Sequence, residues 1–212
     1  MGLRELLRRA VPVEPQELLR RYFINTLFDS TFVVLGILAA SAFVADANPD
    51  VALGTVFAAC LAIGISTAVS VYEAEHVETE IEMQKVERAM LSSMEDTAVE
   101  RKARASAYAV ATVNFFAPVL VAIVMGTPLL LYDAGIIGDF GAAAMISSVF
   151  GISIIFVAGY YLGTLGRKRP WLRAVRMSVI ALLAFGALIL FLMVQGGVFA
   201  RGREDLIAHG GH

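Results

Sequence analysis

Long apolar segments alternate with short polar segments along most of this chain. Five apolar segments reach the length of about 20 residues that an α-helix needs to cross the hydrocarbon core of a bilayer. They are residues 22–45, 51–72, 105–132, 138–165 and 172–194. A chain of 212 residues could not bury five such segments in one soluble core. The pattern therefore predicts an all-α integral membrane protein with five transmembrane helices.

Composition and charge refine this picture. Hydrophobic residues make up 58% of the chain, the mean hydropathy is +0.73, and only 17% of residues are charged. Fifteen of the 17 lysines and arginines lie in the N-terminal arm, between the second and third spans, or between the fourth and fifth. Since short cytoplasmic loops are enriched in lysine and arginine, we expect a cytoplasmic N-terminus and an external C-terminus.

The acidic stretch "YEAEHVETEIEMQKVERAMLSSMEDTAVERKARA", residues 72–105, holds nine of the 19 carboxylates of the chain. Residues 65–90 contain no proline or glycine and many good helix formers, so the second helix should leave the membrane near Tyr72 and continue. "SSMED" should end it, and Thr97 with Glu100 has capping-box spacing. These signals predict a cytoplasmic helical hairpin between spans 2 and 3.

The carboxylates of this stretch fall on two faces of the predicted helix. At 100° per residue, Glu75, Glu78 and Glu82 share one face. The other face carries Glu73, His76, Glu80 and Glu87. Only Lys85 and Arg88 oppose these charges, so the carboxylates repel one another unless a cation lies between them. Carboxylates with an imidazole suit Fe²⁺ or Mn²⁺. The pattern favours a divalent-metal site, and a merely solvated acidic helix is the alternative.

Asp29 is the only acidic residue well inside an apolar segment, eight residues beyond Arg21. Intramembrane carboxylates are costly and usually face a cavity or an ion path. We therefore interpret Asp29 as a cation ligand or a proton-carrying group. An aspartate near the interface that pairs with an arginine is the alternative.

Other residues of the spans bear on helix packing. Pro118 and Pro128 are expected to interrupt the third span, and Gly159 and Gly163 should let helices approach closely. Cys60, the only cysteine, cannot form an intrachain disulfide and is expected in the core. Four polar residues are expected to bond neighbouring helices: Asn114, Ser147, Ser148 and Ser153.

The predicted organisation has five parts: a basic N-terminal arm (1–21), spans 1 and 2 (22–72), an acidic metal-binding region (73–104), spans 3 to 5 (105–197) and an external tail (198–212). Apolar residues of the arm share one helical face, which favours a helix at the membrane surface over a disordered arm. His209 and His212 are more typical of a flexible tail than of a metal site.

Three segments resemble the vacuolar iron transporter family, most closely its compact prokaryotic members. They are "RRYFINTLFDSTFVVLGILAA", "YEAEHVETEIEMQKVERAMLSSMEDT" and "GRKRPWLRAVRMSVIALLAFGALI", and the resemblance covers nearly all of residues 18–196. It implies five-span proteins of the prokaryotic cell membrane that dimerise. It also implies export of Fe²⁺, and often Mn²⁺, in exchange for protons, with carboxylates between spans 2 and 3 that gather the metal.

The resemblance also bears on individual residues. Asp29 corresponds to the family's first-span aspartate, followed here by Ser30 in place of glycine. Val71 stands where the family often has a pore glutamate, and Glu73 or Glu75 could substitute for it. The expected metal ligands are Asp29, Glu73, Glu75, His76, Glu78, Glu82, Glu95 and Glu100.

We therefore expect a proton-coupled Fe²⁺ or Mn²⁺ exporter that works as a homodimer in a lipid bilayer and has no tightly bound cofactor. The sequence contains no Walker-type phosphate-binding loop, so it gives no sign that ATP hydrolysis drives the transport. A metal-responsive membrane protein without transport is the second reading. An enzyme is disfavoured because no nucleophile–base pair stands out. A net charge of −2, with basic residues that follow membrane topology, gives no sign of nucleic-acid binding.

Overall fold

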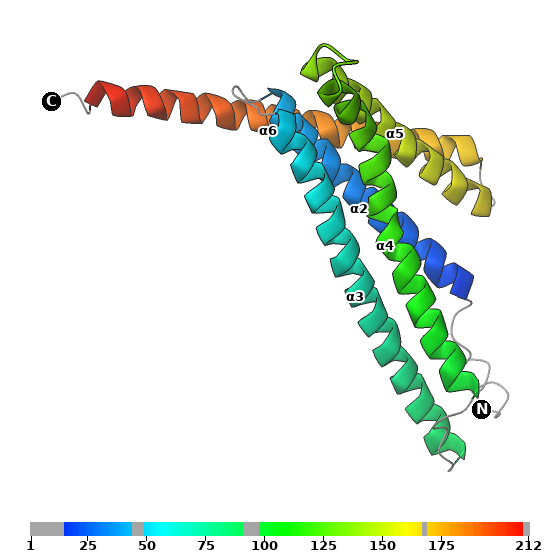
Figure 1. Ribbon diagram of the computed structural model, residues 1–212. Helices are drawn as coiled ribbons and strands as arrows, with labels where there is room; N and C mark the ends of the chain where they lie inside the picture. The colour runs from blue at the N-terminus through cyan, green and yellow to red at the C-terminus, as the bar shows by residue number, and fades with distance from the viewer. Residues whose placement is uncertain (1–14, 44–48, 91–97, 167–168, 210–212) are drawn as a thin grey trace. The chain divides into compact units, whose positions relative to one another are not determined.

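The computed structural model describes residues 15–43, 49–90, 98–166 and 169–209, and within these ranges the chain is helical apart from short turns (Figure 1). The helices are α2 (Pro15–Phe43), α3 (Pro49–Met90), α4 (Ala98–Asp133), α5 (Phe140–Leu165) and α6 (Pro170–His209). The predicted all-α architecture is confirmed. Residues 1–14 of the N-terminal arm, which was expected to form a surface helix, lie outside the described residues, and residues 15–21 of the arm form the first part of α2.

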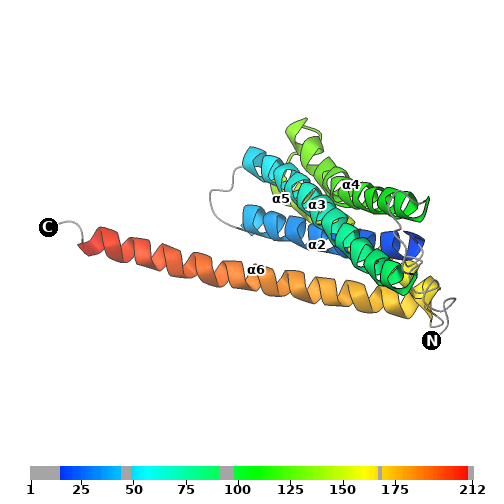
Figure 2. The same ribbon diagram turned by 90° about the horizontal axis from the view of Figure 1, so that it is seen from below.

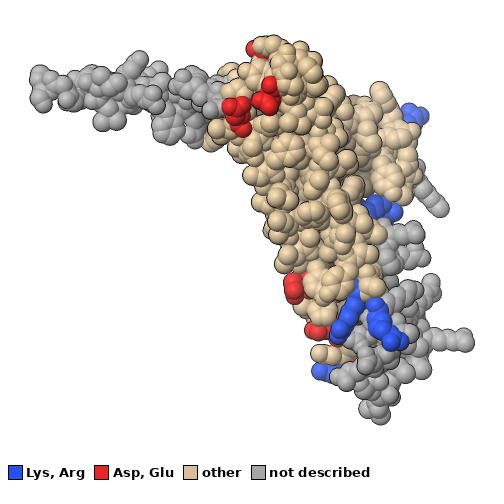
Figure 3. All heavy atoms as spheres, in the orientation of Figure 1, with Lys and Arg blue, Asp and Glu red and all other residues tan. Residues whose placement is uncertain are grey.

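Each of these helices is long and apolar enough to cross a membrane. The candidate spans are Glu17–Ala42, Pro49–Arg88, Arg104–Asp133, Phe140–Leu165 and Pro170–Val194. The predicted number and order of long apolar helices are confirmed, and all five are candidate spans. Figure 3 shows a broad uncharged surface between separate groups of charged side chains. Many large apolar side chains are exposed, as a helix surface in contact with lipid requires.

The predicted continuation of the second helix is also confirmed. α3 has 42 residues, and at 1.5 Å per residue it extends about 63 Å, roughly twice the thickness of a hydrocarbon core. α3 is therefore longer than one crossing requires, and its C-terminal half carries the polar residues that follow Tyr72. The predicted break at "SSMED", together with Thr97 of the capping pair, lies outside the described residues, and α4 is helical from Ala98.

The chain divides into two compact units, Met1–Leu27 with Leu61–Val119 and Phe28–Cys60 with Leu120–His212. In the first unit, α3 and α4 lie side by side (Figures 1 and 2). A Cβ atom on Gly64 would lie 3.1 Å from the carbonyl oxygen of Phe115. Eight residues further along α3, the hydroxyls of Tyr72 and Tyr108 lie 3.3 Å apart. The register of these two contacts shows that the helices run antiparallel.

In the second unit, α5 and α6 pack through small residues. A Cβ atom on Gly159 would lie 3.1 Å from Cα of Ala174, and one on Gly163 would lie 2.5 Å from Cα of Pro170. The close helix approach expected from these glycines is confirmed. α6 continues to His209, so its helix extends well into the segment expected to be a tail. Cys60 is buried, as expected.

The expected interruption of the third span is wrong, because α4 is one helix through both Pro118 and Pro128. Each proline removes one intrahelical hydrogen bond, and packing against other helices can offset that loss. Near Pro128, for example, the hydroxyl of Ser147 on α5 donates to the carbonyl oxygen of Met125 at 2.7 Å.

The expectation that polar residues join neighbouring helices is right for Ser147 alone. The hydroxyls of Ser148 and Ser153 donate to carbonyls four residues earlier in α5 itself. The amide atoms of Asn114 are buried and have no hydrogen-bond partner in the described part of the chain. Sequence shows which residues are polar, but a bond between helices depends on which face each residue occupies.

Candidate functional site

The polar half of α3 follows directly on an apolar half without charge. Residues 51–72 contain no acidic or basic residue, whereas six carboxylates occur between Glu73 and Glu87. Glu75, His76 and Glu82 are half-buried, and Glu73, Glu78 and Glu80 are exposed. The cluster is therefore neither a fully solvated face nor a closed cavity. We call residues 73–88 the acidic segment.

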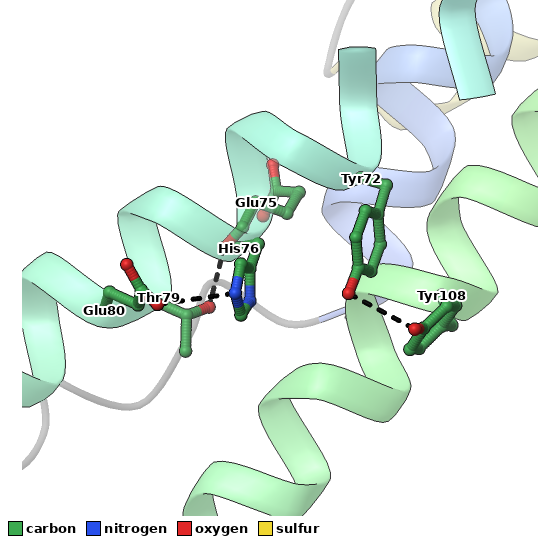
Figure 4. Close-up of polar contacts among 6 residues, drawn as sticks. All are labelled: Tyr72, Glu75, His76, Thr79, Glu80 and Tyr108. Atoms are coloured by element: carbon green, nitrogen blue, oxygen red, sulfur yellow. Dashed lines mark hydrogen bonds and ion pairs between the residues drawn. The ribbon is translucent and has the colours of Figure 1, made fainter. Parts of the chain in front are cut away.

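Glu75 is held by a residue of another helix. The hydroxyl of Tyr22 on α2 donates a hydrogen bond to Oε1 of Glu75 at 2.9 Å. The main-chain carbonyl of Glu75 accepts a second bond, from the hydroxyl of Thr79 at 2.7 Å (Figure 4). The bond from Tyr22 is charge-assisted, and bonds of this kind orient a carboxylate strongly. The carboxylate of Glu75, at the end of the acidic segment nearest the span, is thus held in place.

Glu82 lies within electrostatic range of two other carboxylates. Partial burial raises the pKa of Glu82, the negative charge of Glu78 raises it further, Lys85 opposes the shift, and Glu75 adds to it. The shared face that helical spacing predicts for Glu75, Glu78 and Glu82 is therefore present. A carboxyl group that holds its proton more strongly than usual because of burial and neighbouring like charges is one that a bound cation would deprotonate.

His76 lies in a chain of contacts on the other face. Its Nε2 is 3.4 Å from Oε1 of Glu80, one turn further along α3. Its ring stacks on that of Tyr72, with the ring centres 5.7 Å apart and the planes 6° from parallel. The ring of Tyr72 in turn contacts Tyr108 of α4, with 4.6 Å between ring centres (Figure 4). His76 therefore links the acidic segment to the contact between α3 and α4.

The structure does not assemble the eight expected ligands into one chelate. Among the described residues, no three histidine, cysteine, aspartate or glutamate side chains lie close enough together to hold a metal ion. Glu95 lies outside the described residues, as does the side chain of Glu100. Asp29 has an exposed side chain and belongs to the second unit, whereas the acidic segment belongs to the first.

Sequence reasoning missed the aromatic partners of the site. Tyr22 and Tyr72 lie at the predicted membrane boundaries, where tyrosine is common because its ring is apolar and its hydroxyl polar. That position by itself predicts that each tyrosine hydroxyl has a polar hydrogen-bond partner. It could not identify Glu75 as the partner of Tyr22, because 53 residues separate them.

The arrangement can attract a cation and bind it weakly. Three carboxylates share one face of α3 with a single opposing lysine, Lys85. The pair formed by His76 and Glu80 lies on the opposite side of the same helix. The imidazole and carboxylate of the His76–Glu80 pair are ligand types that suit Mn²⁺ or Fe²⁺, and the three carboxylates of the opposite face attract divalent cations. As for known proteins, no family model, no curated protein and no solved structure matches this chain.

Proposed function

We propose that this chain exports Fe²⁺ or Mn²⁺ from the cytoplasm in exchange for protons, as a homodimer. The observation that carries the proposal is the common face of Glu75, Glu78 and Glu82, where Glu75 and Glu82 are half-buried and the charges of Glu78 and Glu75 add to the effect of burial in raising the pKa of Glu82. A protein gains nothing in stability from such repulsion, whereas a divalent cation would remove it. The five candidate spans supply the membrane part that export requires.

In this proposal, the orientation follows from the distribution of lysine and arginine. The N-terminus and the acidic segment are cytoplasmic, the acidic segment forms part of a helical hairpin, and the C-terminus is external. The metal ion collects on the acidic segment first. Glu95, between α3 and α4, and Glu100 supply further oxygen ligands.

The metal ion then reaches Asp29, on a path formed by the first spans of two protomers. A carboxylate within the apolar layer binds a divalent cation strongly only while it is ionised. Protonation of Asp29 from the outside therefore releases the cation, and this competition couples export to proton entry. The chain is, on this proposal, a compact prokaryotic member of the vacuolar iron transporter family.

A second candidate is a membrane protein that binds metal on the acidic segment and signals without transport. One observation favours it: Val71 is a buried apolar residue, 6% exposed, at the end of the second span where an exporter of the proposed family often has glutamate. In this case, metal on the acidic segment changes contacts with a cytoplasmic partner.

Flux of Fe²⁺ and Mn²⁺ into proteoliposomes, with and without a pH gradient, separates the two. We expect gradient-dependent flux in the native protein and its loss in Asp29→Asn. Asp133→Asn, an exposed aspartate at the end of α4, is the matched control and should retain flux. Metal binding without flux would exclude transport and favour the second candidate, and absence of binding would exclude both.

A further inference from the structure

Asn114 is a buried polar residue of α4 that no protein group satisfies. It is 1% exposed, and neither Oδ1 nor Nδ2 has a hydrogen-bond partner in the described ranges of the chain. The residues one turn away on the same helical face, Val110, Ala111 and Ala117, are buried and apolar. The great majority of buried side-chain polar atoms bond a protein group or an ordered water. The amide of Asn114 therefore needs a hydrogen-bond partner that the apolar residues on the same face of α4 cannot supply.

The main chain at the same residue also lacks its regular donor. In an α-helix the N–H of residue i+4 donates to the carbonyl of residue i, and the residue four positions after Asn114 is Pro118, which has no N–H. Pro128 removes the same bond from Val124, but valine adds no polar side-chain atom. Position 114 is thus the point where a freed carbonyl and a buried amide coincide.

The depth of Asn114 excludes bulk solvent as the partner. The candidate span Arg104–Asp133 begins at Arg104, and Asn114 lies ten residues further along it. This corresponds to about 15 Å along the helix, inside an apolar layer about 30 Å thick. Backbone groups freed by proline in membrane helices are satisfied by neighbouring helices, by hydroxyl side chains or by ordered water.

We propose that Asn114 and its freed carbonyl bind an internal water molecule within the membrane part of α4. The residue offers two oxygens that accept hydrogen bonds and an amide nitrogen that donates, and a buried water typically makes about three bonds. A metal ion would satisfy the oxygens but leave the Nδ2 hydrogens unpaired. Water both donates and accepts hydrogen bonds, so it satisfies both kinds of group.

The role of this water rests on the proposed proton-coupled transport. A water molecule accepts a proton from a group on one side and releases another to a group on the opposite side, so it passes a proton between its own two hydrogen-bond partners beside Asn114 without a buried ionised side chain. Asn114 does not itself ionise: it is a positioning residue, and the water is the relay. The site is accordingly expected to serve the proton and not the metal ion.

Hydroxyl-radical labelling by pulsed X-ray radiolysis tests the water site in the full-length protein in nanodiscs, because bound water generates radicals beside buried side chains. Pro118 and Pro128 are both fully buried on α4, so they form a matched pair. We expect several-fold more label on Pro118 than on Pro128, and equal label on the two in Asn114→Leu. Equal label in the native protein would overturn the site, and this comparison stands even if the variant fails to fold.

The relay is tested separately in proteoliposomes. We expect Asn114→Leu to reduce Mn²⁺-driven proton flux at least tenfold while Mn²⁺ affinity of the purified protein stays within twofold. Unchanged proton flux in this variant would overturn the relay and leave the exporter intact. Absence of flux in the native protein would instead overturn the proposed function and the relay with it, while the labelling result would still decide the water site.

Discussion

The hydroxyl of Tyr22 on α2 donates a 2.9 Å hydrogen bond to Oε1 of Glu75 on α3, across 53 residues of sequence. It joins the start of the first candidate span to the start of the acidic segment. The bond stabilises the pairing of two helices and orients a carboxylate of the candidate metal site. Stability and metal binding should therefore both respond when it is removed.

Replacing Tyr22 with phenylalanine keeps the ring and deletes the hydrogen bond. We expect the free energy of unfolding to fall by about 1.5 kcal/mol, the low end for a bond to a charged acceptor, because both side chains are only half-buried. Reversible unfolding in mixed micelles measures this. Tyr161→Phe on α5, 50% exposed, is the control and should change stability by less than about 0.5 kcal/mol. Equal effects of the two variants would contradict a stabilising role for the bond.

The raised pKa of Glu82 makes the stability of the first unit depend on pH. The folded protein holds this proton more strongly than the unfolded chain, so stability falls as pH rises from the ordinary glutamate value of 4.5 through the raised pKa. Glu82→Gln should remove that part of the fall and raise the melting temperature at neutral pH. Thermal unfolding between acid and neutral pH measures the profile.

The control for this pH profile is Glu17→Gln, an exposed glutamate in the first turn of α2. It should leave the difference between acid and neutral melting temperatures unchanged. If Glu82→Gln gives the same profile as the native protein, the carboxylate repulsion inferred for the acidic segment is not energetically significant.

Metal binding at the acidic segment should release protons. A bound cation favours the ionised form of each ligand, so Mn²⁺ lowers the pKa of Glu82 and its affinity increases with pH. Glu82→Gln should weaken Mn²⁺ binding about tenfold, equivalent to about 1.4 kcal/mol. Isothermal titration calorimetry in buffers of different ionisation enthalpy counts the protons. Undiminished proton release in Glu82→Gln would show that this carboxyl group is not a ligand.

The contact between α5 and α6 leaves no room for a side chain at Gly163. A Cβ atom there would lie 2.5 Å from Cα and 2.8 Å from the carbonyl oxygen of Pro170, both main-chain atoms that cannot rotate away. Gly163→Ala should cost about 1–3 kcal/mol of unfolding free energy. Gly186→Ala on α6, where no atom lies within 4 Å, is the matched control and should be neutral or stabilising by up to about 1 kcal/mol. Equal stability of the two variants would contradict this packing.

Much of the fold could be predicted because a bilayer imposes a requirement on each segment by itself. A helix that crosses it needs sufficient length and apolar composition, and both are properties of consecutive residues. The extension of α3 to Met90 could be predicted for the same reason, since helix propensity is local. The interruption at Pro118 and Pro128 was wrongly predicted, because whether proline ends a helix depends on the packing around it.

The candidate site could be predicted only in part. Helical periodicity placed Glu75, Glu78 and Glu82 on one face, and the structure agrees. Helical periodicity gives no information about contacts with other helices. The bond from Tyr22 to Glu75 and the contact between Tyr72 and Tyr108 could therefore not be predicted from it. The coordination of a metal by the full expected set stays a prediction.

The sequence by itself determined five apolar helices, their order and the polar extension of the second, since these depend on interactions between a segment and its solvent. Only the tertiary structure decided which side chains meet: Gly163 against Pro170, Ser147 with the carbonyl of Met125, and Asn114 buried without a protein partner in the described chain. The physical reason is range. The hydropathy of a segment is a property of its consecutive residues, whereas a hydrogen bond or a close contact requires two particular atoms within a few ångströms.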